Sequence, residues 1–297
     1  MKFFVELALK IRSGLNKCGD YGYISEKEMR NNISKIIHQT YHSKVLPFEI
    51  QQNIDHLKAN NPDWEHRLYD DSDIETYIKK NYPHLLKTYH KINPIYGAAR
   101  VDFFRYLLIY NEGGLYLDIK STLEKPLSQL VCPSDRYFLC HWQNDIGQVH
   151  EKKGFHEGVS NPFGELQQWH ILAVAGHPFL KAVIENVNHN INEYNPIFHD
   201  TGFWAVLNLT GPIAYTAAIM NVIKLHPHRL ERDNSKFGFI YSIYESQGNT
   251  FGHRTILKKH YSTLDEPLTN LPLLSKLLYR AIKPLIKITK NTLVKLR

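Results

Sequence analysis

One short stretch in the middle of the chain places an acid and a base directly after an apolar run. In "GGLYLDIK" (residues 113–120) a glycine pair precedes Leu-Tyr-Leu, and Asp118 and Lys120 follow. An aspartate at the end of a buried strand can bind a metal ion or a sugar hydroxyl through its oxygens. The position two residues further on often carries a second acid, whereas this chain has a lysine there. The stretch therefore predicts a binding site that presents both charges to its ligand.

Two further charged residues precede this stretch on a predicted helix. Residues 92–114 have the strongest helical pattern in the body, with Pro94 near the start and a glycine pair at the end. Asp102 and Arg105 are one turn apart, so they lie on the same face of that helix. The surrounding pattern is apolar, and a buried charge needs partners. We expect both residues to contribute to the binding site; the alternative is a simple salt bridge within the helix.

The remaining pattern predicts an α/β body around this site. Strand-like and helical segments alternate with short loops, which favours a parallel sheet with right-handed crossovers. Ser72 and Glu75 are spaced as a capping box for the second helix. Ligands of such sheets bind beyond the carboxyl ends of the strands, where Asp118 is expected. Strands are expected within 34–43, 63–71, 115–120, 136–140 and 254–262, and helices within 1–20, 46–62, 73–81, 92–112, after 176–179 and within 210–225.

The positive charge of the chain is confined to its C-terminal end. Residues 271–297 carry seven basic and no acidic residues, which equals the net charge of +7 of the whole chain. Residues 1–270 therefore sum to zero, which excludes a basic nucleic-acid-binding surface on the body. Leucine and isoleucine recur at helical spacing in the tail, opposite its bases, which is typical of a helix lying on an anionic membrane surface. The alternative is that this helix packs on the body or forms an oligomer interface.

These features predict two parts, a catalytic domain over residues 1–270, with a helix at 1–20 included, and a basic amphipathic membrane-associating tail over 271–297. The three cysteines have no CxxC spacing, so they favour a reducing compartment and indicate neither a disulfide framework nor a zinc site.

Five motifs, taken in chain order, resemble glycosyltransferase family 32. They are "KIIHQTYHS" (35–43), "NPDWEHRLYDD" (61–71), "AARVDFFRYLLIYNEGGLYLDIK" (98–120), "GHPF" (176–179) and "TGP" (210–212). The family consists of sugar transferases that share a DXD-containing sugar-binding region, with members in bacterial capsule, O-antigen and other surface-polysaccharide pathways. The resemblance covers roughly residues 33–225. It implies a GT-A-type nucleotide-diphosphosugar transferase fold with a mixed, mainly parallel sheet, and retention of the anomeric configuration.

The resemblance also assigns roles to particular residues. Asp102 and Arg105 match a pair expected to grip hydroxyls and to orient the pyrophosphate of the donor. Asp118 matches the first acid of the DXD motif, and Asp118 and Lys120 are the expected catalytic residues. The loops "ELQQW" (165–169) and "TGP" match segments placed around donor and acceptor. The donor-binding residues implied in this way are His38, Gln39, Thr40, Asp102, Arg105 and Gly114.

Lys120 leaves two hypotheses about a divalent cation, Mn²⁺ or Mg²⁺. In the first, Lys120 performs the electrostatic role of the metal and neutralises the departing nucleoside diphosphate. In the second, a metal remains, held by Asp118, the pyrophosphate and a residue of the C-terminal half such as His260 or His253. An exposed lysine at the end of a strand is a third, structural interpretation.

The resulting expectation is a retaining glycosyltransferase that moves a hexose or N-acetylhexosamine from a UDP- or GDP-linked donor to a saccharide acceptor carried on a lipid. The expected pathway is bacterial surface-polysaccharide synthesis (capsule, O-antigen or lipopolysaccharide). The expected location is cytoplasmic, at the inner face of the cell membrane. The alternative is an inactive relative that acts as a binding or scaffold protein at the membrane. Nucleic acid is not an expected partner, because Tyr279 is the one aromatic residue of the tail.

Overall fold

The computed structural model describes residues 14–295 except 149, 157–158, 233–236 and 245–260, and for 285–295 it describes the helix alone. Six strands form the main sheet in the order β2-β1-β3-β6-β5-β7. Strand β6 is antiparallel to both neighbours, whereas β1 pairs in parallel with β2 and β3, and β5 with β7. The strands are β1 (Ile36–Thr40), β2 (Glu65–Tyr69), β3 (Gly114–Leu117), β5 (Tyr137–Cys140), β6 (His170–Ala173) and β7 (Arg229–Glu231). The predicted α/β class with a mixed, mainly parallel sheet is confirmed, in agreement with a GT-A-type fold.

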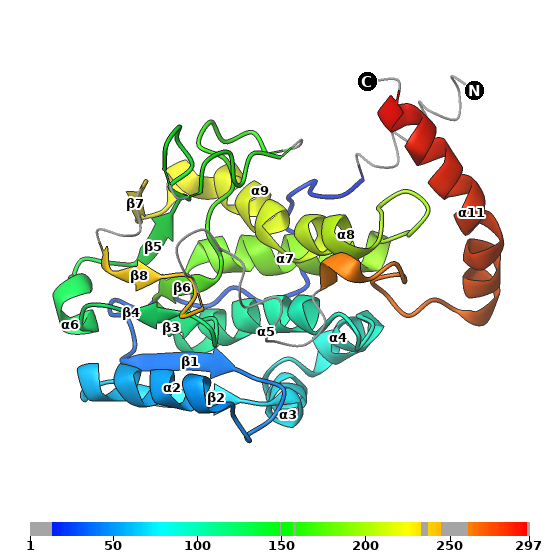
Figure 1. Cartoon of the computed structure of the whole chain (residues 1–297). Coiled ribbons are helices and arrows are strands. Elements are labelled where there is room, and N and C mark those ends of the chain that lie inside the picture. Colours follow the sequence, from blue (N-terminus) through cyan, green and yellow to red (C-terminus); the bar gives the residue numbers. More distant parts are fainter. Residues whose placement is uncertain (1–13, 149, 157–158, 233–236, 245–260, 296–297) are drawn as a thin grey trace.

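Helices and a small second sheet cover the two faces of the main sheet (Figure 1). One apolar cluster joins α5, α7, α8 and α9 to the face that carries Tyr116 and Tyr137. A second cluster joins the other face to α2, α6 and the two-stranded sheet of β4 (Thr122–Leu123) and β8 (Phe239–Ile240). The helices are α2 (Phe48–Asn60), α3 (Asp71–Asn81), α4 (Leu86–Lys91), α5 (Gly97–Glu112), α6 (Leu127–Leu130), α7 (Pro178–Glu193), α8 (Gly202–Leu209), α9 (Pro212–Val222) and α11 (Leu273–Lys295).

A tight turn between α5 and β3 positions the charged residues of the site. Gly113 and Gly114 have φ of 71° and 98°, and a Cβ on Gly114 would lie 2.6 Å from the carbonyl oxygen of Ile36. Eight residues of helix rise about 12 Å, and four residues of strand rise about 13 Å. Arg105 lies eight residues before Gly113 in α5, and Asp118 lies four residues after Gly114, just beyond β3. Both residues are therefore at about the same distance from the glycine turn, so their side chains can meet.

Two local predictions differ from the structure. Asp70 is the N-cap of α3 and accepts hydrogen bonds from the backbone N–H groups of Ser72 and Asp73, while the Asp73 carboxylate accepts one from the Asp70 N–H. The predicted capping box of Ser72 and Glu75 was therefore wrong, because an aspartate two residues earlier takes the same role. The predicted strand at 254–262 lies mostly outside the described residues, and Tyr261–Thr263 form a 3₁₀ turn.

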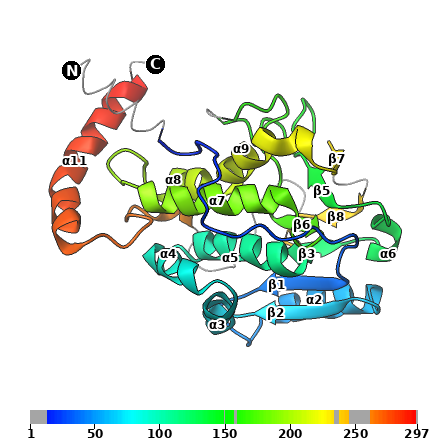
Figure 2. The same cartoon turned by 180° about the vertical axis from the view of Figure 1, so that it is seen from behind.

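The N-terminal segment has no regular secondary structure over residues 14–20. Residues 14–20 contain no helix, so this part of the helix predicted at 1–20 was wrong, and residues 1–13 lie outside the described residues. Asn16 receives hydrogen bonds from the side-chain amides of Asn186 and Asn190 at 2.9 and 2.8 Å. Figure 2 shows this segment running along α7 and then past α5. Hydrogen bonds from side chains of α7 thus hold this segment in place of the backbone hydrogen bonds that a helix would have.

The segment Gly202–Leu225 is long and apolar enough to cross a membrane by length and composition alone. It comprises α8, α9 and a short 3₁₀ turn, and 61% of its most apolar window is buried inside the protein. Both helices pack in the core with α7. The segment therefore behaves as part of the core of the body.

Acid should destabilise this fold through three buried histidines. Burial lowers the pKa of His38 and His170 to about 3 and that of His177 to about 4. The unfolded chain takes up these protons near pH 6.5 and the folded chain does not, so stability is lost as the pH falls below 6.5. At pH 5 each histidine should cost about 2 kcal/mol of unfolding free energy relative to pH 7.5. Urea denaturation at both pH values checks this, and an equal free energy at pH 5 would contradict it.

Candidate functional site

Arg105 joins two carboxylates that come from different elements. Its Nη2 lies 2.9 Å from Oδ1 of Asp102 on the same helix, and its Nη1 lies 3.2 Å from Oδ1 of Asp118 beyond β3. The side chains of Arg105 and Asp102 are 6% and 3% exposed, and that of Asp118 is 22% exposed. The guanidinium also lies over the ring of Tyr116, 4.5 Å from its centroid. Asp102 and Arg105, the predicted pair, thus lie beside Asp118. The alternative of a simple salt bridge within the helix does not describe them, because Arg105 also pairs with a carboxylate outside the helix.

Two loops from later in the chain complete the surroundings of Asp102. Thr210 donates a hydrogen bond from Oγ1 to Oδ2 of Asp102 at 3.0 Å, and the Gln168 amide donates one to Oδ1 at 3.3 Å. The backbone carbonyl of Gln168 also accepts a bond from Nη1 of Arg105 at 2.9 Å. Thr210 and Gln168 belong to the "TGP" and "ELQQW" segments. Both segments therefore lie at the predicted site.

Strand β6 explains how the "ELQQW" segment, which directly precedes it, reaches the site. Parallel strands β1 and β3 end at one edge of the sheet, and the antiparallel β6 begins at that edge, with His170 opposite Leu117. The N–H of Asp118 donates to the carbonyl of Trp169 at 2.9 Å. An antiparallel strand inserted among parallel ones thus adds the residues before it to the ligand-binding edge.

Burial raises the pKa of Asp102 to about 6, although Arg105 and Thr210 favour its ionised form. Asp102 is therefore an anion at neutral pH and takes up a proton in mildly acidic solution. Protonation would remove one of the two charges that hold Arg105.

Lys120 adds a second cation to the site. Its Nζ lies 2.6 Å from Oδ2 of Asp118 and 4.2 Å from the centroid of the Tyr241 ring. Lys120 is 7% exposed, so the interpretation as an exposed lysine was wrong. Its backbone carbonyl accepts a hydrogen bond from Ile243 at 2.8 Å, which fixes the Tyr241 segment over it. Two acids and two bases thus form one linked cluster.

This donor set does not fit a divalent cation of the DXD type. The two oxygens of Asp118 already face the cations Arg105 and Lys120, and a protonated lysine has no lone pair to offer a metal. Within the described part of the chain no group of three or more His, Cys, Asp or Glu residues could hold a metal ion. His260 and His253, the other ligands considered from the sequence, lie outside that part.

The predicted donor-binding residues on β1, His38, Gln39 and Thr40, point to opposite faces of that strand. His38 is fully buried, and its ring nitrogens lie 3.0 Å from the Tyr69 hydroxyl and 3.1 Å from the Gly113 carbonyl oxygen. Thr40 is on the same face and shares a hydrogen bond with the Tyr116 hydroxyl at 2.9 Å. Thr40 therefore supports the ring beneath Arg105, whereas His38 supports the glycine turn.

Gln39 and Gly114 lie away from the carboxylates of the cluster. Gln39 is fully buried on the other face of β1, and its Oε1 lies 2.8 Å from Nε2 of His66. Its amide lies 3.4 Å from the Asp118 carbonyl oxygen, so it contacts only the backbone of the site. Gly114 starts β3 and is separated from Asp118 by the length of the strand. The structure does not bring Gly114 to the site.

Aromatic residues around the cluster were not predicted from the sequence. Tyr116 could have been found, because it lies two residues before Asp118 and strand alternation places both on one face. Tyr241 carried no such signal, since it lies more than a hundred residues from Lys120. Glu165, the first residue of the "ELQQW" segment, is buried; it accepts a hydrogen bond from Nε1 of Trp142 at 2.9 Å, and its other oxygen lies 3.0 Å from Nε2 of His156.

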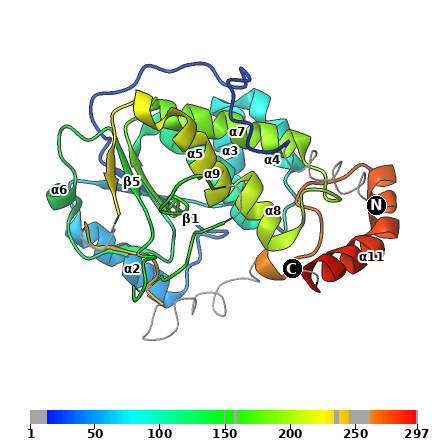
Figure 3. The same cartoon turned by 90° about the horizontal axis from the view of Figure 1, so that it is seen from above.

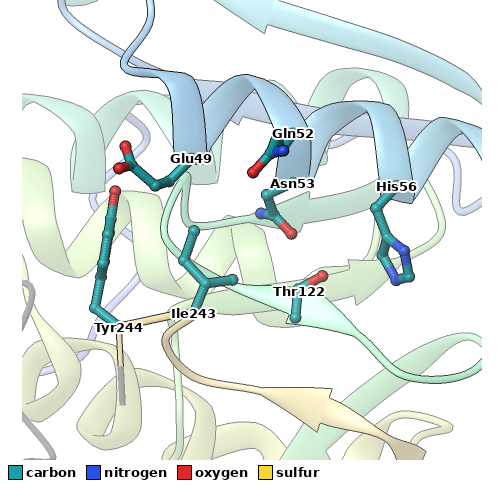
Figure 4. A pocket seen from close by; sticks show the side chains of 7 residues that line it. All are labelled: Glu49, Gln52, Asn53, His56, Thr122, Ile243 and Tyr244. Carbon is teal, nitrogen blue, oxygen red and sulfur yellow. The ribbon is translucent and has the colours of Figure 1, made fainter. Parts of the chain in front are cut away.

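A cavity of about 370 Å³ lies beside the segment that carries Lys120 (Figure 4). One helical face of α2 forms one wall, and β4 and the 243–244 segment form the other. Within the described residues, the buried hydroxyls of Thr122 and Tyr244 have no hydrogen-bond partner. Carboxylate, amide, imidazole and hydroxyl groups together suit a ligand rich in hydroxyls. The lining residues are Glu49, Gln52, Asn53, His56, Thr122, Ile243 and Tyr244.

Comparison with protein families identifies the region that contains most of this site. Residues 47–138 match the family model described as "Glycosyltransferase sugar-binding region containing DXD motif". The match includes α2, Asp102, Arg105, Asp118 and Lys120. Residues 47–138 are therefore similar to a glycosyltransferase sugar-binding region, which is the likeness that the sequence motifs indicated.

Similar proteins are fungal mannosyltransferases. The chain is 29% identical over 183 residues to "Mannosyl phosphorylinositol ceramide synthase CSH1" of Saccharomyces cerevisiae, covering 61% of this chain and 41% of the relative. It is 24% identical over 184 residues to "Inositol phosphoceramide mannosyltransferase 1" of Schizosaccharomyces pombe, covering 61% and 49%. It is 26% identical over 176 residues to "Initiation-specific alpha-1,6-mannosyltransferase" of Candida albicans, covering 54% and 44%. The chain thus spans less than half the length of these curated relatives.

A solved structure, "PaToxG Glycosyltransferase", aligns with 74% of this chain and 78% of its own, at 20% identity and a TM-score of 0.43. This likeness is too distant to support a further conclusion. None of the relatives named above is a bacterial capsule or O-antigen enzyme, so the expected bacterial pathway gains no support from them.

Removing Arg105 should destabilise the protein strongly. Arg105→Ala would leave Asp102 buried beside Asp118 without its cation, which should lower the unfolding free energy by about 3–5 kcal/mol. The matched control is Arg232→Ala, which breaks an exposed ion pair with Asp145 and should cost less than about 1 kcal/mol. Urea denaturation of both variants at pH 7.5 gives the comparison, and equal losses would contradict the structural role of Arg105.

Proposed function

We propose that this chain is a retaining glycosyltransferase that moves a hexosyl unit from a nucleotide-diphosphate sugar to a hydroxyl of a lipid-carried acceptor. The observation that carries the proposal is the cluster of Asp102, Arg105 and Asp118 at the edge where β1 and β3 end. Ligands of α/β sheets bind at this edge. Carboxylates bind sugar hydroxyls, and guanidinium groups bind phosphate oxygens. The cluster therefore supplies both types of contact that a sugar nucleotide requires.

Mannose is the first sugar to test, with GDP-mannose as donor. The names of the similar proteins given above describe mannosyl transfer, and two of them name an inositol-phosphate ceramide. A hexose or N-acetylhexosamine on UDP is the broader expectation from the sequence. The bacterial surface-polysaccharide pathway stays a prediction without support from these relatives.

The cavity beside α2 offers a place for one sugar unit of the donor or of the acceptor. It shares the 120–122 segment with the charged cluster, because the Asn53 amide donates to the Ser121 carbonyl oxygen at 2.8 Å. Five of its lining residues lie within the matched sugar-binding region. This adjacency supports the proposal, because groups suited to sugar hydroxyls lie next to groups suited to phosphate oxygens.

Helix α11 is proposed to hold the enzyme at an anionic membrane, at the inner face of the cell membrane. Figure 3 shows it at one end of the molecule, beyond α8. Tyr279 is buried, and Lys283 forms an ion pair with Asp265 at 2.9 Å, so the helix is attached to the body. The leucines before this attachment face outward, with Leu273, Leu274, Leu277 and Leu278 exposed by 75%, 72%, 54% and 53%. An apolar face flanked by bases suits a lipid surface that carries the acceptor.

A second candidate is an inactive relative that binds sugar nucleotides at the membrane without transferring the sugar. The observation that favours it is Lys120, which pairs with Asp118 where the family motif has a second acid. Such a protein would bind a donor and release no nucleoside diphosphate.

Transfer should depend on Asp118. With GDP-mannose, and with UDP-linked hexoses as further donors, the wild type should release nucleoside diphosphate, and Asp118→Asn should reduce turnover by at least about 100-fold because it removes a charge at the donor. Asp71→Asn on the exposed start of α3 is the matched control and should keep full activity. Donor binding without any release in the wild type would support the inactive alternative, and no binding to any donor would refute both.

Membrane binding should depend on the leucine face of α11. Replacing Leu274, Leu277 and Leu278 together by Ser should release the protein from vesicles of phosphatidylglycerol and phosphatidylcholine in a sedimentation assay, because it removes the apolar area that would enter the lipid. Leu225→Ser, at a leucine 71% exposed outside α11, is the control and should leave binding unchanged. Unchanged vesicle binding by the triple variant, or equal wild-type binding to neutral vesicles, would refute the proposed role.

A further inference from the structure

We infer that Lys120 takes the place of the divalent cation and stabilises the nucleoside diphosphate that leaves during sugar transfer. The inference rests on the proposed function and specifies a catalytic residue for it. It starts from the disagreement between the family motif, which supplies a second acid, and this chain, which places a buried cation there.

The burial of Lys120 indicates a specific role for its charge. A lysine that is 7% exposed has lost most of its hydration, which is costly unless partners compensate. In this structure the Asp118 carboxylate, 2.6 Å from the Lys120 ammonium, and the ring of Tyr241, whose centroid is 4.2 Å from it, compensate for the lost hydration. An ammonium has three N–H donors, and the carboxylate of Asp118 takes one of them. The ammonium is therefore held in place with capacity to donate to a phosphate oxygen.

A second lysine increases the positive charge around the same ring. Nζ of Lys153 lies 4.6 Å from the Tyr241 centroid and 3.7 Å from that of Trp142. Arg105, Lys120 and Lys153 thus bring three cations to this side of the site. Cations suit a diphosphate, whereas they would repel Mn²⁺ or Mg²⁺.

The reaction then needs no charge from a metal. The bond between the anomeric carbon and the donor oxygen breaks, and its electron pair passes to the β-phosphate oxygen of the nucleoside diphosphate. The acceptor oxygen forms the new bond to the anomeric carbon on the same face, and its proton passes to the released phosphate. Lys120 donates to the phosphate oxygen as its negative charge develops, where a fixed cation is most effective.

The test is to restore the second acid of the motif. Wild type should bind GDP or UDP in calorimetry and turn over the donor in EDTA, with no gain from Mn²⁺. Lys120→Met should reduce kcat by about 100- to 1,000-fold under both conditions. Lys120→Asp should lose binding and turnover in EDTA and regain at least part of both with Mn²⁺, because Asp118 and the new acid then offer a ligand pair. Lys152→Met, at a lysine whose side chain is 85% exposed, is the control and should behave as wild type.

The outcomes separate this inference from the proposed function. Wild-type turnover that EDTA abolishes and Mn²⁺ restores would overturn the role of Lys120 while leaving glycosyl transfer intact. Failure of the wild type to bind GDP or UDP and to turn over any donor, with or without Mn²⁺, would overturn the proposed function itself. A Lys120→Met variant that folds by circular dichroism and keeps wild-type kcat in EDTA would show a purely structural ion pair and would also overturn the inference.

Discussion

The site depends on one guanidinium held between two carboxylates. Arg105 contacts Asp102 from its own helix and Asp118 from the next strand, and it is almost completely buried. A buried cation of this kind is tolerated only where its partners are fixed. The glycine turn and the matched lengths of helix and strand fix Asp118, and Thr210 and Gln168 fix Asp102. Segments far apart in the sequence thus meet at one ion-pair network, because each supplies a charge or a hydrogen bond to it.

The sequence predicted the parts of this network that follow local periodicity. Helical spacing placed Asp102 and Arg105 on one face, and the buried strand ending before Asp118 placed that residue at the ligand edge. The orientation of His38 and Thr40 away from Gln39 also follows from strand alternation, and it separates residues that the family motif groups together. These features are local, so a single sequence is sufficient to derive them.

Long-range features could not be derived in this way. Strand β6 has four residues, all buried, so it carries no alternating pattern that would distinguish it from a loop. Tyr241 reaches Lys120 only because β8 pairs with β4, two residues beyond the motif. Without Tyr241, Lys120 could be read as an exposed lysine at the end of a strand. The burial that gives this residue its proposed role is thus a property of the tertiary structure.

We propose that the ion-pair cluster binds a diphosphate and that Lys120 replaces the cation of the family motif. The most direct test is a crystal structure of the chain grown with GDP or UDP in the presence of Mn²⁺. We expect a β-phosphate oxygen within hydrogen-bond distance of the Lys120 ammonium, Arg105 still between Asp102 and Asp118, and no Mn²⁺ at Asp118. A diphosphate bound away from this cluster, or an Mn²⁺ ion between Asp118 and the diphosphate, would contradict it.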